Sequence, residues 1–250
     1  MIPALIAVGA LVYTAWLLEA VLATGLDPVG TYVSELAAED QPFGTFFRST
    51  DLAAGSLVLA GAVWAVVRAV RGPREPWTLI GWAGVAFFGA ATAVDSRLPL
   101  SCTPTADPEC AAREAAGLVP ATHTAHAVSS SLAMTGALIG IVGLTYAARR
   151  YGRLPELARF GPALVVLALA ATGWTLGSIA AFDAGHGTWG LGIGQRLQVL
   201  FVAVWLGLLA LSLARETARR APEGRQDTNP DADAGREADP GTGRPETVTG

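Results

Sequence analysis

The chain has 250 residues, of which 52% are hydrophobic and only 15% are charged, and its mean hydropathy is +0.43. An ordinary soluble domain carries about 25% charged residues, so this composition argues against a soluble globular protein. The formal net charge of −4, without any basic stretch with interleaved aromatic residues, argues against a nucleic-acid partner. Repeated apolar runs of about 20 residues instead predict helices that cross a lipid bilayer.

Six apolar segments are each long enough to cross a bilayer as a helix. They lie at positions 2–26, from between 43 and 51 to 71, 77–94, 120–149, 160–182 and 195–215. The first could instead be a cleaved signal peptide, but Glu19 interrupts it and no basic residue precedes it, which favours an uncleaved span. The predicted fold class is therefore all-α integral membrane, a bundle of six transmembrane helices formed by residues 1–215.

Arginines mark one side of the predicted bundle. They cluster after the second, fourth and sixth spans, at positions 68–74, 149–159 and 215–220. Because basic residues concentrate in cytoplasmic loops, both termini are predicted to be cytoplasmic, with the protein in the plasma (inner) membrane. Residues 216–250 are rich in Pro, Gly and charged residues and have few large apolar ones, so they are predicted to form a disordered cytoplasmic tail.

The outward-going spans end at aspartates, and the returning spans begin with polar residues. The aspartates are Asp27, Asp95 and Asp183, and the polar residues are Arg48 and Asp51, His123 and His126, and Gln195 and Arg196. The alternative is that these charges only mark the membrane boundaries. This explains the aspartates, but it explains less well why basic side chains also lie on the side opposite the arginine clusters. The sequence therefore predicts a polar pocket that opens outward.

His123 and His126 are three positions apart and so lie on one face of the fourth helix. With a carboxylate from another helix, Asp95 or Glu35, they could hold a zinc ion in a three-ligand catalytic site. His123, His126 and Asp95 could also act without metal as general acid and base. The alternative is that both histidines only hydrogen-bond neighbouring helices or the loop.

Several polar residues near the outward side are candidates for substrate binding. Ser34 and Glu35 lie in the first outward loop, and Asp51 lies at the start of the second span. Glu35 is expected either to pair with Arg196 or Arg48 across the mouth of the pocket or to stay solvated. Ser34, Glu35, Asp51 and Arg196 are therefore predicted to position a substrate.

Glu19 lies within the apolar part of the first span, where a charge is costly unless it faces a partner or a cavity. Arg196 and His126 are its candidate partners. A protonated Glu19 that hydrogen-bonds a neighbour is the alternative. Because of its depth, Glu19 is grouped with the predicted substrate-binding residues.

The two cysteines, Cys102 and Cys110, lie in the loop that leads into the histidine-bearing helix. On the outward side of the membrane the compartment is oxidising, so this spacing predicts a disulfide that stiffens the loop. The alternative is two free thiols.

Two motifs carry a resemblance to a known family. They are Asp-Pro-Val-Gly-Thr-Tyr-Val-Ser-Glu-Leu at positions 27–36 and Phe-Phe-Arg-Ser-Thr-Asp at positions 46–51. In these motifs the chain resembles domain of unknown function 998 (DUF998), a group of bacterial membrane proteins with six helices. The similarity extends through Asp95 and the histidine-bearing helix, over about residues 1–215. It implies the six-span fold and no established activity.

Two functions from different classes fit these residues. The first is an enzyme of the membrane, a hydrolase or a related lipid-modifying protein, in which a pocket on the outer face binds a lipid or small molecule. The second is a non-enzymatic binding, transport or structural protein, in which the same polar residues form a network that packs the helices. The sequence gives no indication of oligomeric state.

Overall fold

The computed structural model describes residues 1–226, with side chains described as far as position 219. The regular secondary structure of the described residues is helical, with no β-strand, which confirms the all-α part of the predicted fold class. The α-helices are α1 (Ile2–Val12), α2 (Gly44–Arg71), α3 (Pro76–Asp95), α4 (Pro108–Ala115), α5 (Ala121–Arg150), α6 (Pro155–Asp183) and α7 (Leu191–Gln226). Two short 3₁₀ helices precede α2, namely η1 (Ala15–Ala20) and η2 (Val33–Ala37).

Six helical segments are long and apolar enough to cross a membrane, by length and composition. They are Ile2–Ala20, Gly44–Arg71, Pro76–Asp95, Ala121–Arg150, Pro155–Asp183 and Leu191–Arg219. This number matches the prediction, and it makes the chain a multi-pass membrane protein whose environment is a lipid bilayer. The remaining helix, α4, is short and lies in the loop that contains both cysteines.

The first span is not the continuous α-helix that was predicted for residues 2–26. Helix α1 ends at Val12, and the chain continues as the 3₁₀ helix η1. At the break, the Thr14 hydroxyl donates to the carbonyl of Leu11 over 2.7 Å, and Leu17 N–H donates to the carbonyl of Thr14 over 3.0 Å. Hydroxyl-to-backbone bonds of this kind compete with the α-helical pattern, and the tighter turn redirects the residues that follow.

Glycines bring α3 into close contact with both α2 and α5. A Cβ atom on Gly84 would lie 2.6 Å from the backbone nitrogen of Gly140 on α5. A Cβ atom on Gly55 of α2 would lie 2.8 Å from the carbonyl oxygen of Gly89 on α3. Small residues allow such close packing where lipid provides no hydrophobic force between helices. These three helices therefore form the tightly packed part of the bundle.

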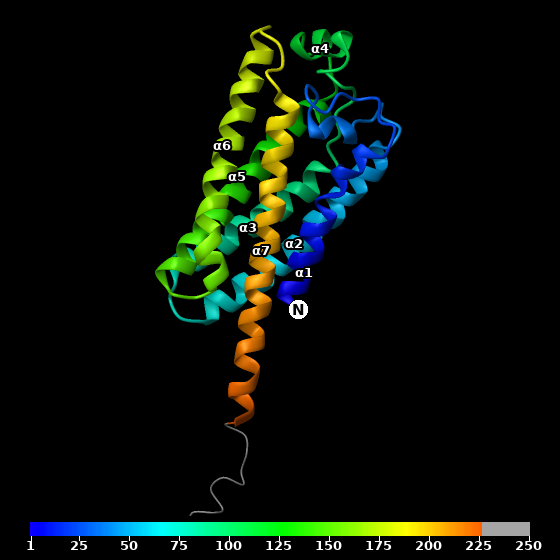
Figure 1. Ribbon diagram of the computed structural model, residues 1–250. Helices are drawn as coiled ribbons and strands as arrows, with labels where there is room; N and C mark the ends of the chain where they lie inside the picture. Colours follow the sequence, from blue (N-terminus) through cyan, green and yellow to red (C-terminus); the bar gives the residue numbers. More distant parts are fainter. Residues whose placement is uncertain (227–250) are drawn as a thin grey trace, which may run out of the picture. The chain divides into compact units, whose positions relative to one another are not determined.

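The connections between helices fall at two ends of the bundle (Figure 1). The N-terminus and the α2–α3 and α5–α6 connections lie at one end, where Arg153 pairs with Glu75 at 3.0 Å. We call this the arginine end, because the arginines at positions 68–74 and 149–159 lie in these connections or in the helix ends that flank them. Helix α4 lies at the opposite end, which we call the α4 end. The predicted cytoplasmic location of the arginine end stays a prediction.

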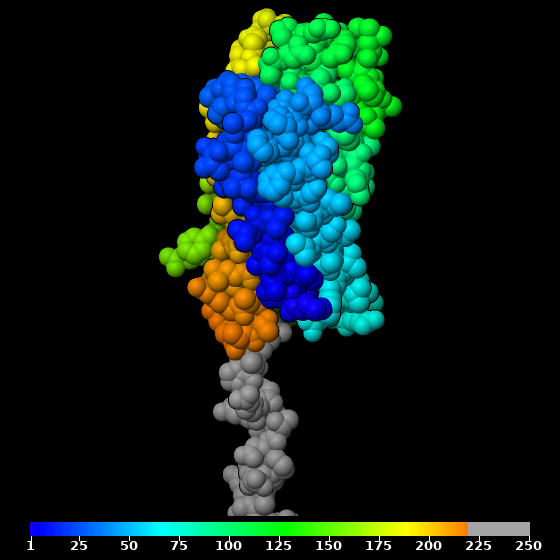
Figure 2. All heavy atoms as spheres, turned by 90° about the vertical axis from the view of Figure 1, so that its right-hand side faces the viewer, coloured from blue at the N-terminus to red at the C-terminus, as the bar shows by residue number. Residues whose placement is uncertain are grey.

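The segments at the α4 end pack against one another. Glu39 N–H donates to the carbonyl of Leu100 over 2.9 Å, which joins the segment after η2 to the loop before α4. Figure 2 shows the same arrangement from the side, with the blue surface of residues 15–37 next to the green surface of the α4 loop. The connection after α1 and the connection after α3 thus form one cap.

The chain divides into two units, Met1–Ala214 and Arg215–Gly250. The sixth span was predicted to end at residue 215, but α7 continues to Gln226. Glu, Ala and Arg residues at positions 216–221 favour helix, which accounts for the extension. The disorder predicted for the rest of the tail concerns residues 227–250, which lie outside the described residues.

Candidate functional site

A cavity of about 380 Å³ lies next to η2 and is lined by residues from all six spans. Its aromatic lining includes Tyr13 and Trp16 from the first span, and its carboxylates are Asp51 of α2 and Asp95 of α3. Hydroxyl and amide side chains come from the later spans: Ser130, Ser131, Thr135, Thr172, Thr175, Gln195 and Gln198. The lining thus combines apolar surface with a small number of polar groups, as binding sites for small molecules do.

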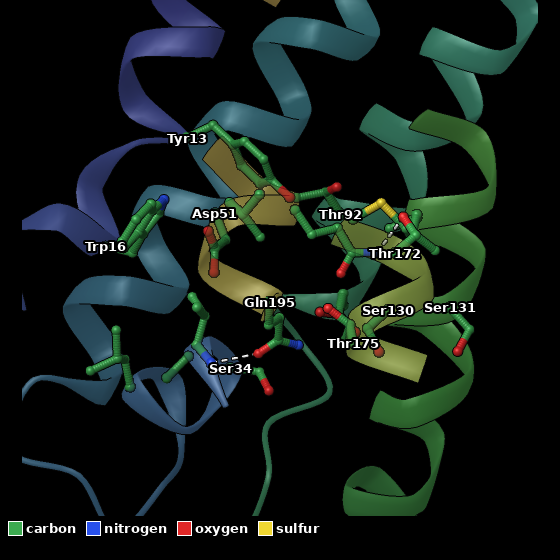
Figure 3. Close-up of a pocket in the computed structure, with 18 of the residues that line it drawn as sticks. Tyr13, Trp16, Ser34, Asp51, Thr92, Ser130, Ser131, Thr172, Thr175 and Gln195 are labelled. Atoms are coloured by element: carbon green, nitrogen blue, oxygen red, sulfur yellow. Dashed lines mark hydrogen bonds between the residues drawn. The ribbon is translucent and has the colours of Figure 1, made fainter. Parts of the chain in front are cut away.

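Several polar atoms of the lining have no partner within the described residues. The indole nitrogen of Trp16 and the hydroxyl oxygens of Thr92 and Thr175 are buried without a hydrogen bond. The Asp51 carboxyl makes no hydrogen bond or salt bridge there. Figure 3 shows Asp51 on the same side of the cavity as Trp16. Because unpaired buried polar groups are costly, this set is suited to bind a polar group that enters the cavity.

Three of the predicted site residues line this cavity: Ser34, Asp51 and Asp95. The other five are not among its described lining residues: Glu19, Glu35, His123, His126 and Arg196. The structure therefore divides the predicted single site into a cavity and several separate polar clusters around it.

His126 and Asp95 form one of these clusters. The Nδ1 atom of His126 lies 3.2 Å from Oδ1 of Asp95 and 3.0 Å from the carbonyl oxygen of Leu98. Because a carbonyl oxygen only accepts, Nδ1 must carry a proton, and the Ser129 hydroxyl donates to the same Asp95 oxygen. Nε2 of His126 is buried without a hydrogen-bond partner. The pair is thus arranged as a carboxylate-oriented imidazole.

His123 faces a different set of groups. The backbone N–H of Ser101 donates to its Nδ1 over 3.1 Å, and the Ser101 hydroxyl lies 3.0 Å from the same atom. Nδ1 therefore accepts, and Nε2 carries the proton and lies 3.6 Å from Oε1 of Glu114. His123 is buried and connects α5 to the loop that carries α4. These contacts agree with the alternative to a catalytic role, in which the histidine only hydrogen-bonds the loop.

The three predicted zinc ligands are not brought together around one point. His126 contacts Asp95, whereas His123 contacts Ser101 and Glu114. Within the described residues, no group of three His, Cys, Asp or Glu side chains is arranged to hold a metal ion. Histidines three positions apart lie on the same face of a helix. Here, however, each ring contacts a different residue of the preceding loop, Ser101 for His123 and Leu98 for His126, and the spacing alone could not indicate this.

Glu35 has none of the partners that were predicted for it. Its side chain is fully buried, and it accepts hydrogen bonds from Thr105 N–H (2.7 Å), from the Thr105 hydroxyl and from Tyr32 N–H (2.9 Å). Burial raises the pKa of Glu35, and the hydrogen bonds from Thr105 and Tyr32 oppose part of this rise. The expected pairing with Arg48 or Arg196 is wrong, and so is the solvated alternative. Glu35 holds η2 against the cysteine loop.

Arg48 and Arg196 each have other partners. The Arg48 guanidinium donates to the carbonyl of Ala37 over 2.6 Å and to the Thr45 hydroxyl over 2.9 Å. Arg196 donates to Glu19 through Nε (2.7 Å) and Nη2 (2.6 Å), and to the carbonyl of Thr31 over 2.8 Å. The predicted pairing of Glu19 with Arg196 is therefore confirmed.

The predicted disulfide is present, joining Cys102 and Cys110. The bridged loop contains Thr105, the residue that holds Glu35. It also follows Ser101, the residue that holds His123. The bridge therefore stiffens the segment that supports both η2 and the start of α5.

Sequence reasoning did not assign Thr92 or Thr175 to the site, whereas Gln195 was among the polar residues that predicted the pocket. Thr92 and Thr175 line it with unpaired hydroxyls, and Gln195 accepts a hydrogen bond from Val33 N–H and so fixes η2 beside the cavity. Isolated hydroxyls in apolar helices usually bond to their own backbone or to a neighbouring helix, so their sequence pattern carries no signal for a site.

Comparison with protein-family models matches residues 6–212 to one described as protein of unknown function (DUF998). No curated protein and no solved structure matches the chain. The matched region contains all the lining residues of the cavity, the His126–Asp95 pair and the disulfide. Since the match covers most of the 250 residues, the chain belongs to the DUF998 family of membrane proteins.

Proposed function

We propose that this protein binds an amphipathic lipid or small molecule in the cavity beside η2, and that the molecule enters from the bilayer. The observation that carries the proposal is the position of the mouth. Of the lining residues, those exposed on the surface are Ser131, Thr135 and Leu176, and all three belong to α5 and α6. The mouth therefore lies between two membrane-crossing helices.

The surroundings of the mouth support entry from lipid. Leu132 of α5 and Leu169 of α6 are 44% and 48% exposed, as expected for side chains that face acyl chains. On the side of η2 the cavity is lined by Val33 and Ser34, and Val33 N–H is bonded to Gln195 of α7. An amphipathic molecule dissolved in the membrane would thus reach the interior by passing between α5 and α6.

The interior suits a molecule with one polar and one apolar part. Met134, Leu138 and Ile179 line the side toward α5 and α6 with apolar atoms. The unpaired hydroxyls of Thr92 and Thr175 offer hydrogen bonds to a polar part. The volume of about 380 Å³ falls in the range of about 300–1,000 Å³ that is usual for small-molecule sites.

The cavity is proposed to lie in the outer half of the plasma (inner) membrane, with both termini in the cytoplasm. The arginine-rich connections support this orientation, since basic loops are retained on the cytoplasmic side. Alkaline phosphatase fused within the α4 loop is expected to be active, and the same reporter fused at Arg74 is expected to be inactive. The reverse pattern of activity would place the cavity in the inner half.

Ligand binding can be tested with tritiated 1-dodecanol and purified protein in nanodiscs of zwitterionic lipid. Saturable binding, after subtraction of empty nanodiscs, is expected for the natural sequence. Replacing Ser131 at the mouth by Trp should reduce it at least about tenfold, because the large ring fills the opening. Leu132→Trp is the matched control, one position away and exposed but outside the lining, and it should bind as before. Equal binding by both variants would refute entry at this mouth.

A second candidate function is the hydrolysis of esters or amides. It is favoured by the imidazole of His126, whose Nδ1 is oriented by Asp95 and whose Nε2 is buried without a hydrogen-bond partner. An imidazole held in this way is the general-base arrangement of many hydrolases. Hydrolysis of p-nitrophenyl laurate by the purified protein, lost in both His126→Gln and Asp95→Asn, would support it. No turnover by the natural sequence would leave ligand binding as the function.

A further inference from the structure

The charges around the cavity identify the kind of ligand that it would take, provided that it binds a ligand as proposed above. Asp51 and Asp95 are the charged residues of the described lining, and no Arg or His is among them. The chain as a whole has no Lys. The lining therefore presents only negative charge to whatever enters.

The two neighbouring arginines are engaged elsewhere. Arg48, one helical turn before Asp51, directs its guanidinium to the carbonyls of Ala37 and Ala38 and to Thr45. Arg196 forms a bidentate pair with Glu19. Since each of these groups already has a close partner, neither supplies a counter-charge to Asp51.

The two carboxylates differ in their surroundings. Asp95 receives the Ser129 hydroxyl and the Nδ1–H of His126. Asp51 receives no hydrogen bond or salt bridge from the described residues. A carboxylate in a site of low dielectric constant, facing a cavity and without a partner, is stabilised most by a positive charge that can also donate hydrogen bonds.

Other groups around the cavity suit the same positive charge. Thr92 and Thr175 are only 6% and 4% exposed, and their unpaired hydroxyl oxygens can accept hydrogen bonds from an ammonium group. Tyr13 and Trp16 line the side on which Figure 3 shows Asp51, and aromatic faces attract cations. These contacts are independent of the carboxylates and favour the same ligand chemistry.

We propose that the cavity recognises a cationic amphiphile, in which an ammonium group pairs with Asp51 and an apolar chain lies along α5 and α6 toward the mouth. An anionic head, such as a phosphate or a carboxylate, would meet two carboxylates and no Arg or His among the described lining residues. A neutral head would leave Asp51 unpaired. The ligand is therefore selected by charge, and Asp51 is the residue that selects it.

The test compares dodecylamine with 1-dodecanol and dodecanoate, which have the same chain length and differ in head-group charge. At pH 7.5 the amine is protonated, as a lysine side chain would be. In zwitterionic nanodiscs the Kd for dodecylamine is expected to be at least about tenfold lower than that for dodecanol, from one charge-assisted hydrogen bond. Dodecanoate is expected to bind most weakly of the three.

Variants at Asp51 distinguish the effect of its charge on ligand preference from an effect of the substitution on folding. Asp51→Asn should reduce the preference for amine over alcohol to less than about threefold, whereas Asp51→Glu, which keeps the charge, should retain it. Asp183→Asn is the matched control, because Asp183 is exposed at the end of α6 and does not line the cavity. It should leave the preference unchanged.

Each result has a distinct meaning. Equal affinity for amine and alcohol, both blocked by Ser131→Trp, would overturn the cationic-ligand inference and leave the proposed binding function intact. A preference for amine that survives Asp51→Asn would overturn the role of Asp51. If no probe shows saturable binding that Ser131→Trp blocks, the proposed function fails, and the inference fails with it.

Discussion

Glu19 and Arg196 are 177 positions apart in the chain and form a bidentate ion pair, with N–O distances of 2.7 and 2.6 Å. Their side chains are only 12% and 10% exposed. The pair joins the first span to the last, and Arg196 also bonds the Thr31 carbonyl that precedes η2. It is therefore the polar contact that closes the bundle beside the cavity.

Removing one member of this pair should destabilise the protein strongly, because the other charge is left buried and alone. Arg196→Met is expected to lower the free energy of unfolding by about 3–5 kcal/mol. The double variant Glu19→Leu/Arg196→Met should recover much of this loss, because no charge remains unpaired. Unfolding in mixed micelles measures the stability of the single and the double variant. A double variant as unstable as the single one would contradict this account.

Arg153→Met provides the control for that measurement. Arg153 also forms an ion pair, with Glu75, but its side chain is 47% exposed. An exposed pair contributes about 0–1 kcal/mol, so this substitution should change stability little. A loss as large as that of Arg196→Met would mean that the loss of an arginine, rather than its burial, determines the effect.

The stability of the cap should depend on pH through Glu35. Its pKa is raised in the folded protein because burial disfavours the carboxylate. The folded state therefore holds this proton more tightly than the unfolded state, and the associated stability is present below the ordinary pKa of 4.5 and is lost as pH rises through the folded value.

Glu35→Gln should flatten this dependence, because Gln mimics the protonated carboxyl and does not titrate. Glu39→Gln is the control, since Glu39 is exposed close by in the chain. The midpoint of thermal unfolding, recorded between about pH 4 and 8, checks both variants. A natural protein whose midpoint rises steadily across this range, with no change in slope in Glu35→Gln, would contradict the assignment.

The surroundings of two helical glycines, Gly84 and Gly177, predict opposite effects for the same substitution. Gly84→Ala places a Cβ 2.6 Å from a backbone nitrogen of Gly140, which cannot move aside, so a loss of about 1–3 kcal/mol is expected. Gly177→Ala on α6 meets no atom within 4 Å, and helix propensity predicts a gain of up to about 1 kcal/mol. Thermal unfolding midpoints should thus move in opposite directions.

The disulfide should stabilise more than its own loop. Replacing Cys102 and Cys110 by Ser is expected to cost about 2–3 kcal/mol, from the chain entropy of a closed loop with a sequence separation of 8. Because Thr105 lies in this loop and holds Glu35, protease cleavage within residues 31–40 should also become faster. Cleavage confined to residues 102–110 would show that the loop and η2 are independent.

Much of the fold could be predicted because length and hydropathy are local properties. Apolar runs bounded by arginines placed α2 and α5 nearly at their observed ends, Arg71 and Arg150. The break at Thr14 could not be predicted, since it depends on one hydroxyl that bonds to a carbonyl in the same helix. The end of α7 was also missed, because charged residues that suggest a tail are good helix formers as well.

The candidate site was predicted only in part. Ser34, Asp51 and Asp95 line the cavity, because polar residues at the ends of membrane helices tend to face the protein interior. The partner of Glu35 could not be predicted, since Thr105 is 70 positions away and its hydrogen bond has no periodic signal. Thr92 and Thr175 were not assigned to the site because a hydroxyl in an apolar helix looks the same whether it faces a neighbour or a cavity.

The Glu35–Thr105 contact also limits the order in which the protein can assemble during synthesis. A ribosome that adds about 5–20 residues per second needs about 4–14 seconds to make the 70 positions between the two residues. During that interval Glu35 lacks the N–H and hydroxyl donors of Thr105, so η2 must wait in water or head groups while two further spans insert. The packing of η2 beside the cavity therefore follows the synthesis of the cysteine loop, and a translational pause before residue 105 would prolong the state in which η2 is unpacked.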